Sequence, residues 1–183
     1  MYSFFKPFPK LNTTRLLLRL NNLKDAKDIF EIYGNKTVCD CSDLNIQTSI
    51  TDAKRYVNNN LKNYHLNKCY TFVVELKAEN KVIGTVSIIE TTYNYKIISI
   101  GYSFNPNYHN KGYATEALEV FLDFCFNTLK TERVEAKVLL NNEPSIKLLK
   151  KLGFNKDALL KKGALYKNGT VDVFLFSKTT VST

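Results

Sequence analysis

The feature that most constrains the fold is a change in hydrophobic periodicity at Lys111. Before this residue, three β-strand-like segments follow one another, at Tyr70–Leu76, Val82–Ile89 and Ile97–Phe104, and short turns at 79–81 and 92–94 separate them. After it, apolar residues recur at the spacing of one helix face: Ala114, Leu118, Phe121, Leu122, Cys125 and Leu129. An antiparallel meander that leads into a long amphipathic helix predicts a mixed α/β domain, with Cys125 in its core.

The segments before the meander predict one strand and two helices. Arg15–Leu20 has the composition of a first strand, and Asp25–Tyr33 that of a first helix. Thr51 and Asp52 are suited to cap a second helix that runs to residue 64, and Gly34–Ile50 is expected to be a loop.

The segments after the long helix predict a parallel strand pair, a helix and a hairpin. Arg133–Leu140 alternates apolar and polar residues, and a strand that leaves a helix is typical of a β-α-β unit. Asn142 can cap the next helix, which ends at Gly153. The turn at 167–169 then leads into a final strand, Val171–Phe176.

Length and composition fit one soluble domain over residues 1–183. The chain is 44% hydrophobic, which is enough for one buried core. No apolar run approaches the ~20 residues of a membrane span, and MYSFFKPFPK has prolines and lysines where a signal peptide would be apolar. We therefore expect a cytoplasmic protein without a membrane partner.

The net charge and the cysteines indicate little about the partners of the protein. The net charge of +9 permits binding of a polyanion, but a chain rich in Lys and Asn throughout would show the same balance, so we expect no nucleic-acid partner. Of four cysteines, only Cys39 and Cys41 are close in sequence, and two histidines cannot complete a zinc site of ordinary spacing. We expect no metal, and free thiols in a reducing compartment.

The chemistry is expected in the segment GYSFNPNYHNKGYAT, residues 101–115. A strand ends there, Asn105 and Pro106 interrupt it, and Gly112 opens the long helix. A helix N-terminus after a loop of small and polar residues offers unpaired N–H groups and a partial positive charge, which suit a phosphate. An ordinary β-to-α turn without a ligand would have the same spacing.

With this segment, the chain resembles the GCN5-related N-acetyltransferases (GNAT), in the ribosomal-protein alanine N-acetyltransferase (RimJ/RimL-type) branch. Four stretches match in order: TTRLLLRL from Thr13, GYSFNPNYHNKGYATEAL, NNEPSIKLLKKLGF and GALYKNGTVDVFLFS. The resemblance implies a single-domain GNAT-like fold with a mixed, mostly antiparallel twisted sheet of about six or seven strands and about four helices.

The resemblance also implies a binding site for acetyl-CoA as cosubstrate. Backbone amides of one loop would surround the pyrophosphate, at His109, Asn110, Lys111, Gly112, Tyr113, Ala114 and Thr115. His109 stands where the family has Gln or Arg. The strand that ends at Phe104, bulged in the family, would part from Arg133–Leu140, so that the Phe104 N–H meets a carbonyl of the pantetheine or thioester and the Asn142 side chain binds pantetheine.

The catalytic groups implied by the resemblance are incomplete. Leu149 replaces the tyrosine that many members use to protonate the leaving thiolate, and Ser145 matches the alternative acid of the alanine branch. A helix-start serine that only satisfies backbone groups is the other interpretation of Ser145. Ser99 and Lys137 occupy positions where relatives carry a glutamate base. Glu75 and Glu90 are possible substitutes, and an ordinary surface carboxylate is the other interpretation of each.

A site without a strong base suits a weakly basic acceptor. An α-amine with a pKa of ~7.8 is partly neutral at pH 7, whereas a lysine amine at ~10.4 is almost entirely charged. We therefore predict transfer of an acetyl group to a primary amine, such as a protein N-terminus. A small amine (a polyamine or an antibiotic) and a non-catalytic ribosome-binding or nucleic-acid-binding module are the alternatives. The acceptor cleft would involve residues 37–50 and 163–169, and a monomer or a homodimer is expected.

Overall fold

The computed structural model describes residues 5–41, 44–92, 94–167 and 169–180. Its strands are β1 (Leu11–Asn12), β2 (Leu16–Leu20), β3 (Tyr70–Leu76), β4 (Lys81–Thr92), β5 (Ile97–Phe104), β6 (Arg133–Leu139), β7 (Asn155–Tyr166) and β8 (Gly169–Thr179). Its α-helices are α1 (Ala26–Tyr33), α2 (Lys36–Cys39), α3 (Ile50–His65), α4 (Tyr113–Asp123) and α5 (Glu143–Lys151). Shorter turns of helix occupy Leu23–Asp25, Pro106–Tyr108 and Phe124–Thr128.

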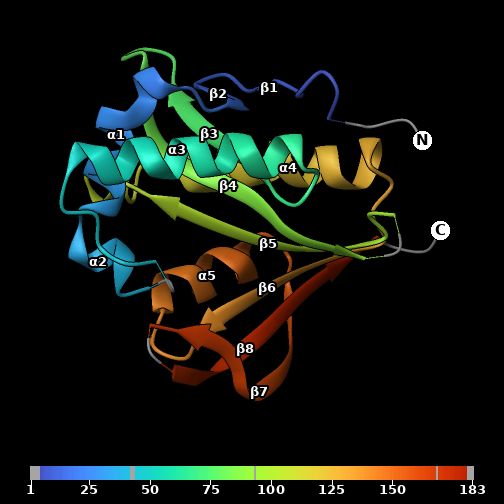
Figure 1. Cartoon of the computed structure of the whole chain (residues 1–183). Coiled ribbons are helices and arrows are strands. Elements are labelled where there is room, and N and C mark those ends of the chain that lie inside the picture. Colours follow the sequence, from blue (N-terminus) through green and yellow to red (C-terminus); the bar gives the residue numbers. More distant parts are fainter. Residues whose placement is uncertain (1–4, 42–43, 93, 168, 181–183) are drawn as a thin grey trace.

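The strands form one open sheet in the order β1-β2-β3-β4-β5-β6-β8-β7 (Figure 1). Every neighbouring pair is antiparallel except β5 and β6, which are parallel from Ile97 opposite Arg133 to Ser99 opposite Glu135. The predicted meander and the predicted parallel pair are both confirmed, as is the mixed α/β fold class.

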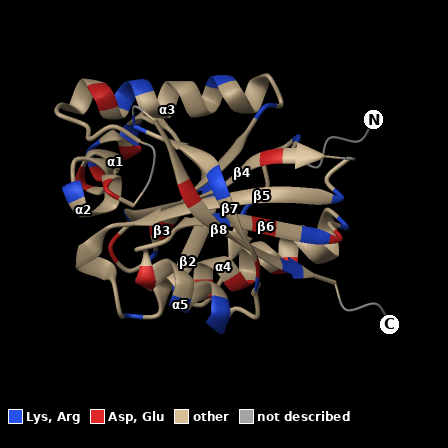
Figure 2. Cartoon of the chain, turned by 90° about the horizontal axis from the view of Figure 1, so that it is seen from below, with Lys and Arg blue, Asp and Glu red and all other residues tan. Residues whose placement is uncertain are grey.

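Helices cover both faces of the sheet (Figure 2). On one face, α1 and α3 bury a smaller core that includes Ile29 and Val57. On the other face, α4 and α5 pack over the main core, which includes Leu118 and Leu149. Cys125 lies in the main core as predicted, and burial raises the pKa of its thiol. The apolar periodicities in the sequence therefore correspond to the buried faces of the helices.

Four details differ from the sequence-based expectations. In its described residues, 34–41 and 44–49, the expected loop contains the short helix α2, whose first turn is capped by the side chain of Asn35. The cap of α3 is Ser49 rather than Thr51, because Ser49 and Asp52 form a reciprocal capping box. Over the described residues the sheet has eight strands, because β1 adds a two-residue edge. The long helix widens into a π-helical turn from Phe124. The predicted turn residues Tyr93 and Asn168 lie outside the described residues.

Charge is spread over the surface rather than gathered. Figure 2 shows Lys and Arg interspersed with Asp and Glu on helices and strands alike. Within the described ranges, no helix has the length and apolar character needed to cross a membrane, and no group of three or more potential metal ligands comes together. All four cysteines are free thiols.

Candidate active site

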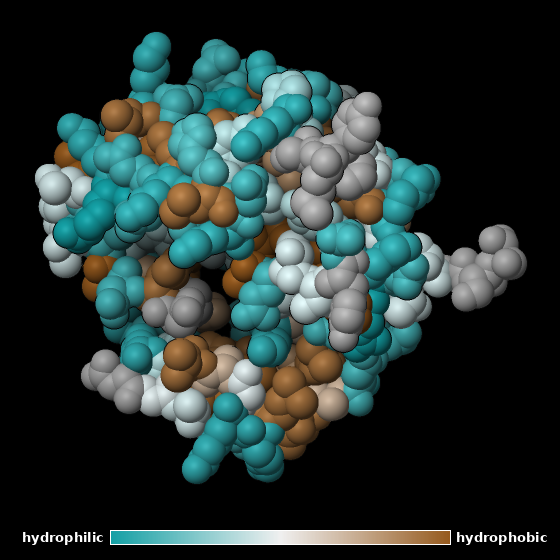
Figure 3. All heavy atoms as spheres, turned by 45° about the vertical axis from the view of Figure 1, so that its right-hand side comes forward, coloured by the Kyte–Doolittle hydropathy of each residue, from teal (hydrophilic) through white to brown (hydrophobic). Residues whose placement is uncertain are grey.

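The parallel strands β5 and β6 part soon after they meet. Their pairing stops after Ser99 and Glu135, and from Ala136 onward the described part of β6 is paired with β8 alone. Over the same stretch, Tyr102–Phe104 of β5 are paired only with β4. Figure 3 shows a hollow between the upper and lower parts of the molecule, with hydrophobic side chains on its rim. The predicted parting of these two strands is thus present.

The bulge next to this opening lies in β4 rather than in β5. Ile100 pairs with Ile88 and Ser99 pairs with Glu90, so Ile89 is the extra residue. A Cβ atom on Gly101 would lie 2.7 Å from Cδ1 of Ile89. Gly101 is therefore explained by the close approach of a neighbouring side chain.

The N-terminus of α4 is open to solvent and carries no side-chain cap. Its N-cap residue is Gly112, whose φ of 79° lies in the left-handed region, and Asn110 is left-handed as well, with φ of 59°. His109, Asn110, Lys111 and Gly112 are exposed, whereas the first helical residues are partly buried. Because no side chain caps the first turn, its N–H groups remain available to an anion, and the glycine leaves the approach clear.

Two side chains of this loop have partners within the protein. Nε2 of His109 lies 3.0 Å from the carbonyl oxygen of Phe104, so the ring links the loop to the end of β5. The ammonium group of Lys111 lies 5.3 Å from the ring centre of Tyr108. The substitution of His for the usual Gln or Arg therefore provides a contact with the strand end, and the loop amides do not depend on it.

A pair of hydroxyl groups connects β5 to α5. The Tyr102 hydroxyl lies 2.6 Å from Oγ of Ser145, and burial raises the pKa of Tyr102 to about 12. The Asn142 side chain accepts a hydrogen bond of 3.2 Å from the Ser145 N–H and so caps α5. Ser145 is therefore not the helix cap, and its hydroxyl is directed to the strand that borders the opening. Sequence reasoning missed Tyr102, whose partner is 43 positions away.

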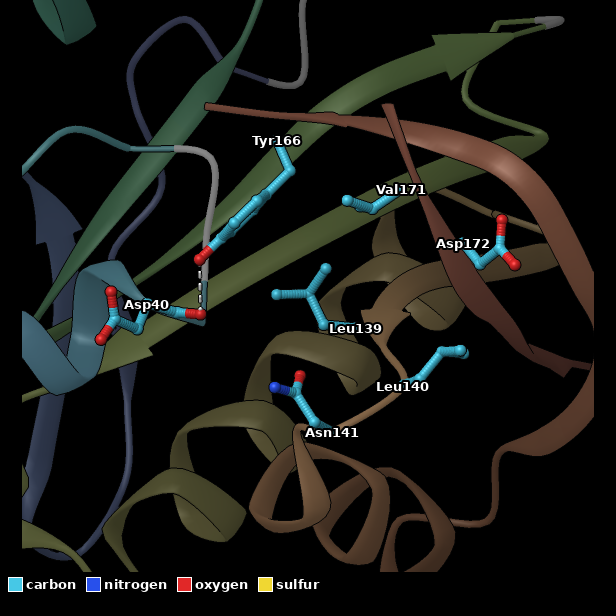
Figure 4. Close-up of a pocket in the computed structure, with 7 residues that line it drawn as sticks. All are labelled: Asp40, Leu139, Leu140, Asn141, Tyr166, Val171 and Asp172. Atoms are coloured by element: carbon cyan, nitrogen blue, oxygen red, sulfur yellow. Dashed lines mark hydrogen bonds between the residues drawn. The ribbon is translucent and has the colours of Figure 1, made fainter. Parts of the chain in front are cut away.

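The two stretches expected to line an acceptor cleft meet at the end of β6. The Tyr166 hydroxyl donates to the Asp40 carbonyl oxygen at 2.9 Å, and Nζ of Lys167 lies 3.0 Å from Oδ1 of Asp40. Beneath this contact lies a cavity of about 320 Å³ with Asp40 and Tyr166 on one side and Leu139, Leu140, Asn141, Val171 and Asp172 on the others (Figure 4). Lysines pair with both of its carboxylates, so the cavity carries little net negative charge.

A second cavity, of about 430 Å³, lies between residues 44–48 and the first half of α3. Its wall includes Tyr33 and Tyr56, whose hydroxyl groups are 3.1 Å apart, and Tyr33 also lies 2.7 Å from Oγ1 of Thr85 on β4. Burial raises the pKa of both phenols, so these groups stay protonated near neutral pH.

The two candidate base residues are placed differently. Glu75 accepts a hydrogen bond of 2.7 Å from Nε of Arg19, which also binds Asp25, so Glu75 belongs to a structural ion cluster. Glu90 is exposed on β4, beside the bulge. In the described part of the chain, no carboxylate is hydrogen-bonded to the Tyr102 and Ser145 hydroxyls.

Comparisons with known proteins agree with this geometry. Residues 15–155 match the model of the acetyltransferase (GNAT) domain. An N-acetyltransferase of Bacillus licheniformis named p20, itself uncharacterised, is 32% identical over 170 residues, which is 91% of this chain and 94% of that protein.

Two solved structures have the same fold over nearly the whole chain. One, provisionally named a ribosomal-protein-serine acetyltransferase of Vibrio cholerae, has a TM-score of 0.86 and 26% identity, and the likeness covers 94% of this chain and 98% of that one. The other, a ribosomal-protein-S5-alanine acetyltransferase of Vibrio fischeri, has a TM-score of 0.78 and 28% identity over 93% and 96% of the two chains.

The fold and the parted strands therefore define an N-acetyltransferase domain of mixed α/β architecture. The chain belongs to the GNAT family of acetyltransferases, and its structural neighbours include the ribosomal-protein acetyltransferases of the RimJ/RimL type. Members of this family use acetyl-CoA as the acetyl donor.

Proposed function

We propose that the protein transfers the acetyl group of acetyl-CoA to the α-amine at the N-terminus of a protein. The observation that carries this proposal is the hydroxyl pair of Tyr102 and Ser145 beside the gap between β5 and β6, with an uncapped helix N-terminus at the end of the same strand. In acetyl-CoA, the slender pantetheine arm would fit the gap, and the phosphates would fit the helix N-terminus. The thioester, which reacts, would lie at the hydroxyl groups.

The residues that would hold the cosubstrate lie along one path. The N–H groups from Asn110 to Thr115 would bind the pyrophosphate, because none of the first-turn amides of α4 has a side-chain cap. The His109 N–H already donates to the Pro106 carbonyl oxygen at 3.1 Å, so His109 would contribute to this loop through its ring contact with Phe104 instead. The Phe104 N–H would donate a hydrogen bond to a carbonyl oxygen of the pantetheine or the thioester in the gap. The Asn142 oxygen already accepts from the Ser145 N–H, so any contact of Asn142 with pantetheine would use its amide NH₂ group.

The hydroxyl pair is suited to donate a hydrogen bond to the leaving sulfur. A thiol has a pKa of ~8.5, which lies about 3.5 units below that of Tyr102, and full proton transfer from the phenol would cost roughly 5 kcal/mol. Tyr102 and Ser145 therefore stabilise the departing thiolate by hydrogen bonding, and solvent supplies the proton that leaves with the thiol. The amine nitrogen gains the acetyl group and loses its own proton to solvent.

Two observations support an α-amine as the acceptor. Solved structures at 26% and 28% identity are named for acetylation of ribosomal proteins. The hydroxyl pair has no carboxylate among its described partners, and an α-amine needs the least help to lose a proton. The carboxylates of Asp40 and Asp172 would favour a polyamine, but Lys36, Lys167 and Lys161 already pair with them.

Buried free thiols fit a cytoplasmic location, where reducing conditions preserve them.

Binding of acetyl-CoA is the first test. We expect saturating acetyl-CoA to raise the free energy of unfolding by about 2.7 kcal/mol at a hundred times its dissociation constant, because it binds only the folded chain. Calorimetry measures the dissociation constant, and denaturant titration measures the gain. Failure to bind acetyl-CoA or CoA at millimolar ligand, together with submicromolar RNA binding that falls steeply with salt, would instead indicate a nucleic-acid-binding module.

The pH dependence of the rate tests the acceptor. With a peptide blocked at its lysines, we expect kcat/KM to rise about tenfold per unit below pH ~7.8 and to level off above it, since only the neutral α-amine reacts. Tyr102, with a pKa of about 12, stays protonated throughout this range. The matched control is the same peptide with a blocked N-terminus and free lysines. A faster reaction of this control, rising beyond pH 9, would contradict the α-amine proposal, as would a preference for polyamines.

A further inference from the structure

The first of the four stretches that resemble the GNAT family begins with TTR at residues 13–15. These residues have no role in the mechanism above, yet they lie against the first turn of α4. Oγ1 of Thr13 donates to Oε1 of Glu116 at 2.6 Å. The Arg15 N–H donates to the same oxygen at 3.0 Å, and Nε of Arg15 donates to Oε2 at 2.6 Å. Glu116 thus receives three hydrogen bonds from residues about one hundred positions away.

The Arg15 side chain continues from Glu116 to the loop in front of α4. Its Nη1 donates to the Lys111 carbonyl oxygen at 3.0 Å, and its guanidinium lies 4.4 Å from the ring centre of Tyr113. Its Nη2 would lie 3.4 Å from a Cβ atom on Gly112. Arg15 therefore contacts Lys111 and Tyr113, the residues on either side of Gly112, at the point where the helix begins.

The contact with Lys111 sets the direction of the next amide. In a trans peptide unit, the carbonyl oxygen and the following N–H point in opposite directions. Holding the Lys111 carbonyl against Arg15 therefore turns the Gly112 N–H away from Arg15. Since Gly112 has the conformational freedom of a glycine at φ of 79°, this peptide unit needs an external contact to keep one orientation.

The contact with Glu116 balances a charge that is unfavourable for anion binding. A carboxylate in the first turn of a helix stabilises the helix itself, but it opposes the binding of a second anion there. Partial burial raises the pKa of Glu116, and the hydrogen bonds from Thr13 and Arg15 more than offset this effect, so that the pKa lies below its usual value. Glu116 is therefore charged at neutral pH, and Arg15 is the cation that balances it.

We propose that Arg15 is a positioning residue for the phosphates of acetyl-CoA: it holds the peptide unit between Lys111 and Gly112 in the orientation that presents an N–H, and it neutralises Glu116. This proposal rests on the proposed use of acetyl-CoA. It assigns Arg15 no contact with the reacting atoms, and it requires the guanidinium fork, because one cation must reach Glu116 and the Lys111 carbonyl together.

The test compares two acetyl donors in the variants Arg15→Gln and Arg15→Lys. S-acetylpantetheine has the thioester and the pantetheine arm of acetyl-CoA but no phosphate. We expect Arg15→Gln to raise the dissociation constant of CoA about tenfold, and to lower kcat/KM with acetyl-CoA by the same factor, with kcat unchanged. With S-acetylpantetheine, kcat/KM should stay within about twofold of the wild type. Arg15→Lys should recover only part of the loss, because an ammonium group has no fork.

Arg133→Gln is the matched control. Arg133 is a partly exposed arginine with two carboxylate partners, Glu135 and Asp157, at the start of β6, and its loss should leave both donors unaffected. Equal losses with both donors in Arg15→Gln would show a merely structural role and overturn the proposal. Full recovery in Arg15→Lys would show that a point charge suffices, which also contradicts it. If the wild-type protein binds no CoA, the proposed function fails first.

Discussion

Replacing Ser145 with alanine is expected to lower kcat by about one to two orders of magnitude and to leave the dissociation constant of acetyl-CoA within about twofold. The loss falls on kcat because the hydroxyl pair interacts with sulfur only as negative charge develops on it. Tyr102→Phe should produce a similar loss, since each hydroxyl orients the other across 2.6 Å. The double variant should be little worse than either single one, as groups that act as a unit are not additive. Stopped assays of thiol release measure all three.

A second hydroxyl pair in the sheet provides the control. Oγ1 of Thr71 and Oγ of Ser87 lie 2.9 Å apart between β3 and β4, so β5 separates this pair from the gap. Ser87→Ala removes an equivalent hydrogen bond, so its effect on stability, about 1 kcal/mol, should resemble that of Ser145→Ala while turnover is unchanged. Equal turnover in wild type and Ser145→Ala, with only a lower melting temperature, would assign the pair a structural role.

The second large effect is expected at the start of α4. Gly112→Ala should weaken acetyl-CoA binding by about ten- to a hundredfold, because a side chain at φ of 79° forces the loop to relax and moves the amide groups of the helix N-terminus. The substitution should also lower the free energy of unfolding by about 1–2 kcal/mol. Calorimetric titration with acetyl-CoA and denaturant unfolding measure the two effects separately.

The chain contains a matched glycine for this experiment. Gly153, after α5, has φ of 80°, and a Cβ atom there would meet only the end of the Lys178 side chain, at 3.6 Å or more. Gly153→Ala should therefore lower the stability by a similar amount without changing the affinity for acetyl-CoA. If both variants lose affinity equally, the loop before α4 does not bind the cosubstrate, and the assignment of residues 109–115 is wrong.

Local patterns predicted most of the elements because many of them have one buried face. The alternation in Arg133–Leu140 and the helical spacing after Lys111 both follow from burial, and the structure places β6 and α4 there. The helix α2 was not predicted, because four residues are too few to show a period. The start of α3 was misplaced because Thr51 and Asp52 are typical cap residues, whereas Ser49 forms the box with Asp52.

Only the contiguous part of the candidate site could be proposed from the sequence. The strand, loop and helix from Gly101 to Thr115 are adjacent in sequence, so their spacing indicates an anion site. The pairing of Tyr102 with Ser145 and that of Arg15 with Glu116 join residues 43 and 101 positions apart, and no local pattern encodes such contacts. Likewise, β6 stays paired with β8 from Arg133 to Leu139, whereas its pairing with β5 ends at Glu135, and this difference involves three strands that are far apart in the sequence.

That parting creates a sheet edge inside the molecule. An ordinary outer edge exposes its unpaired amides to any passing chain and invites aggregation. Here the unpaired sides of Ile100–Phe104 and Ala136–Leu139 face each other within one domain, below α4 and beside α5. Neither a second folded protein nor another broad sheet can dock on such an edge, but a thin, flexible molecule with amide groups of its own can. The space between the two strands thus limits the ligand by its width, independently of any side-chain contact.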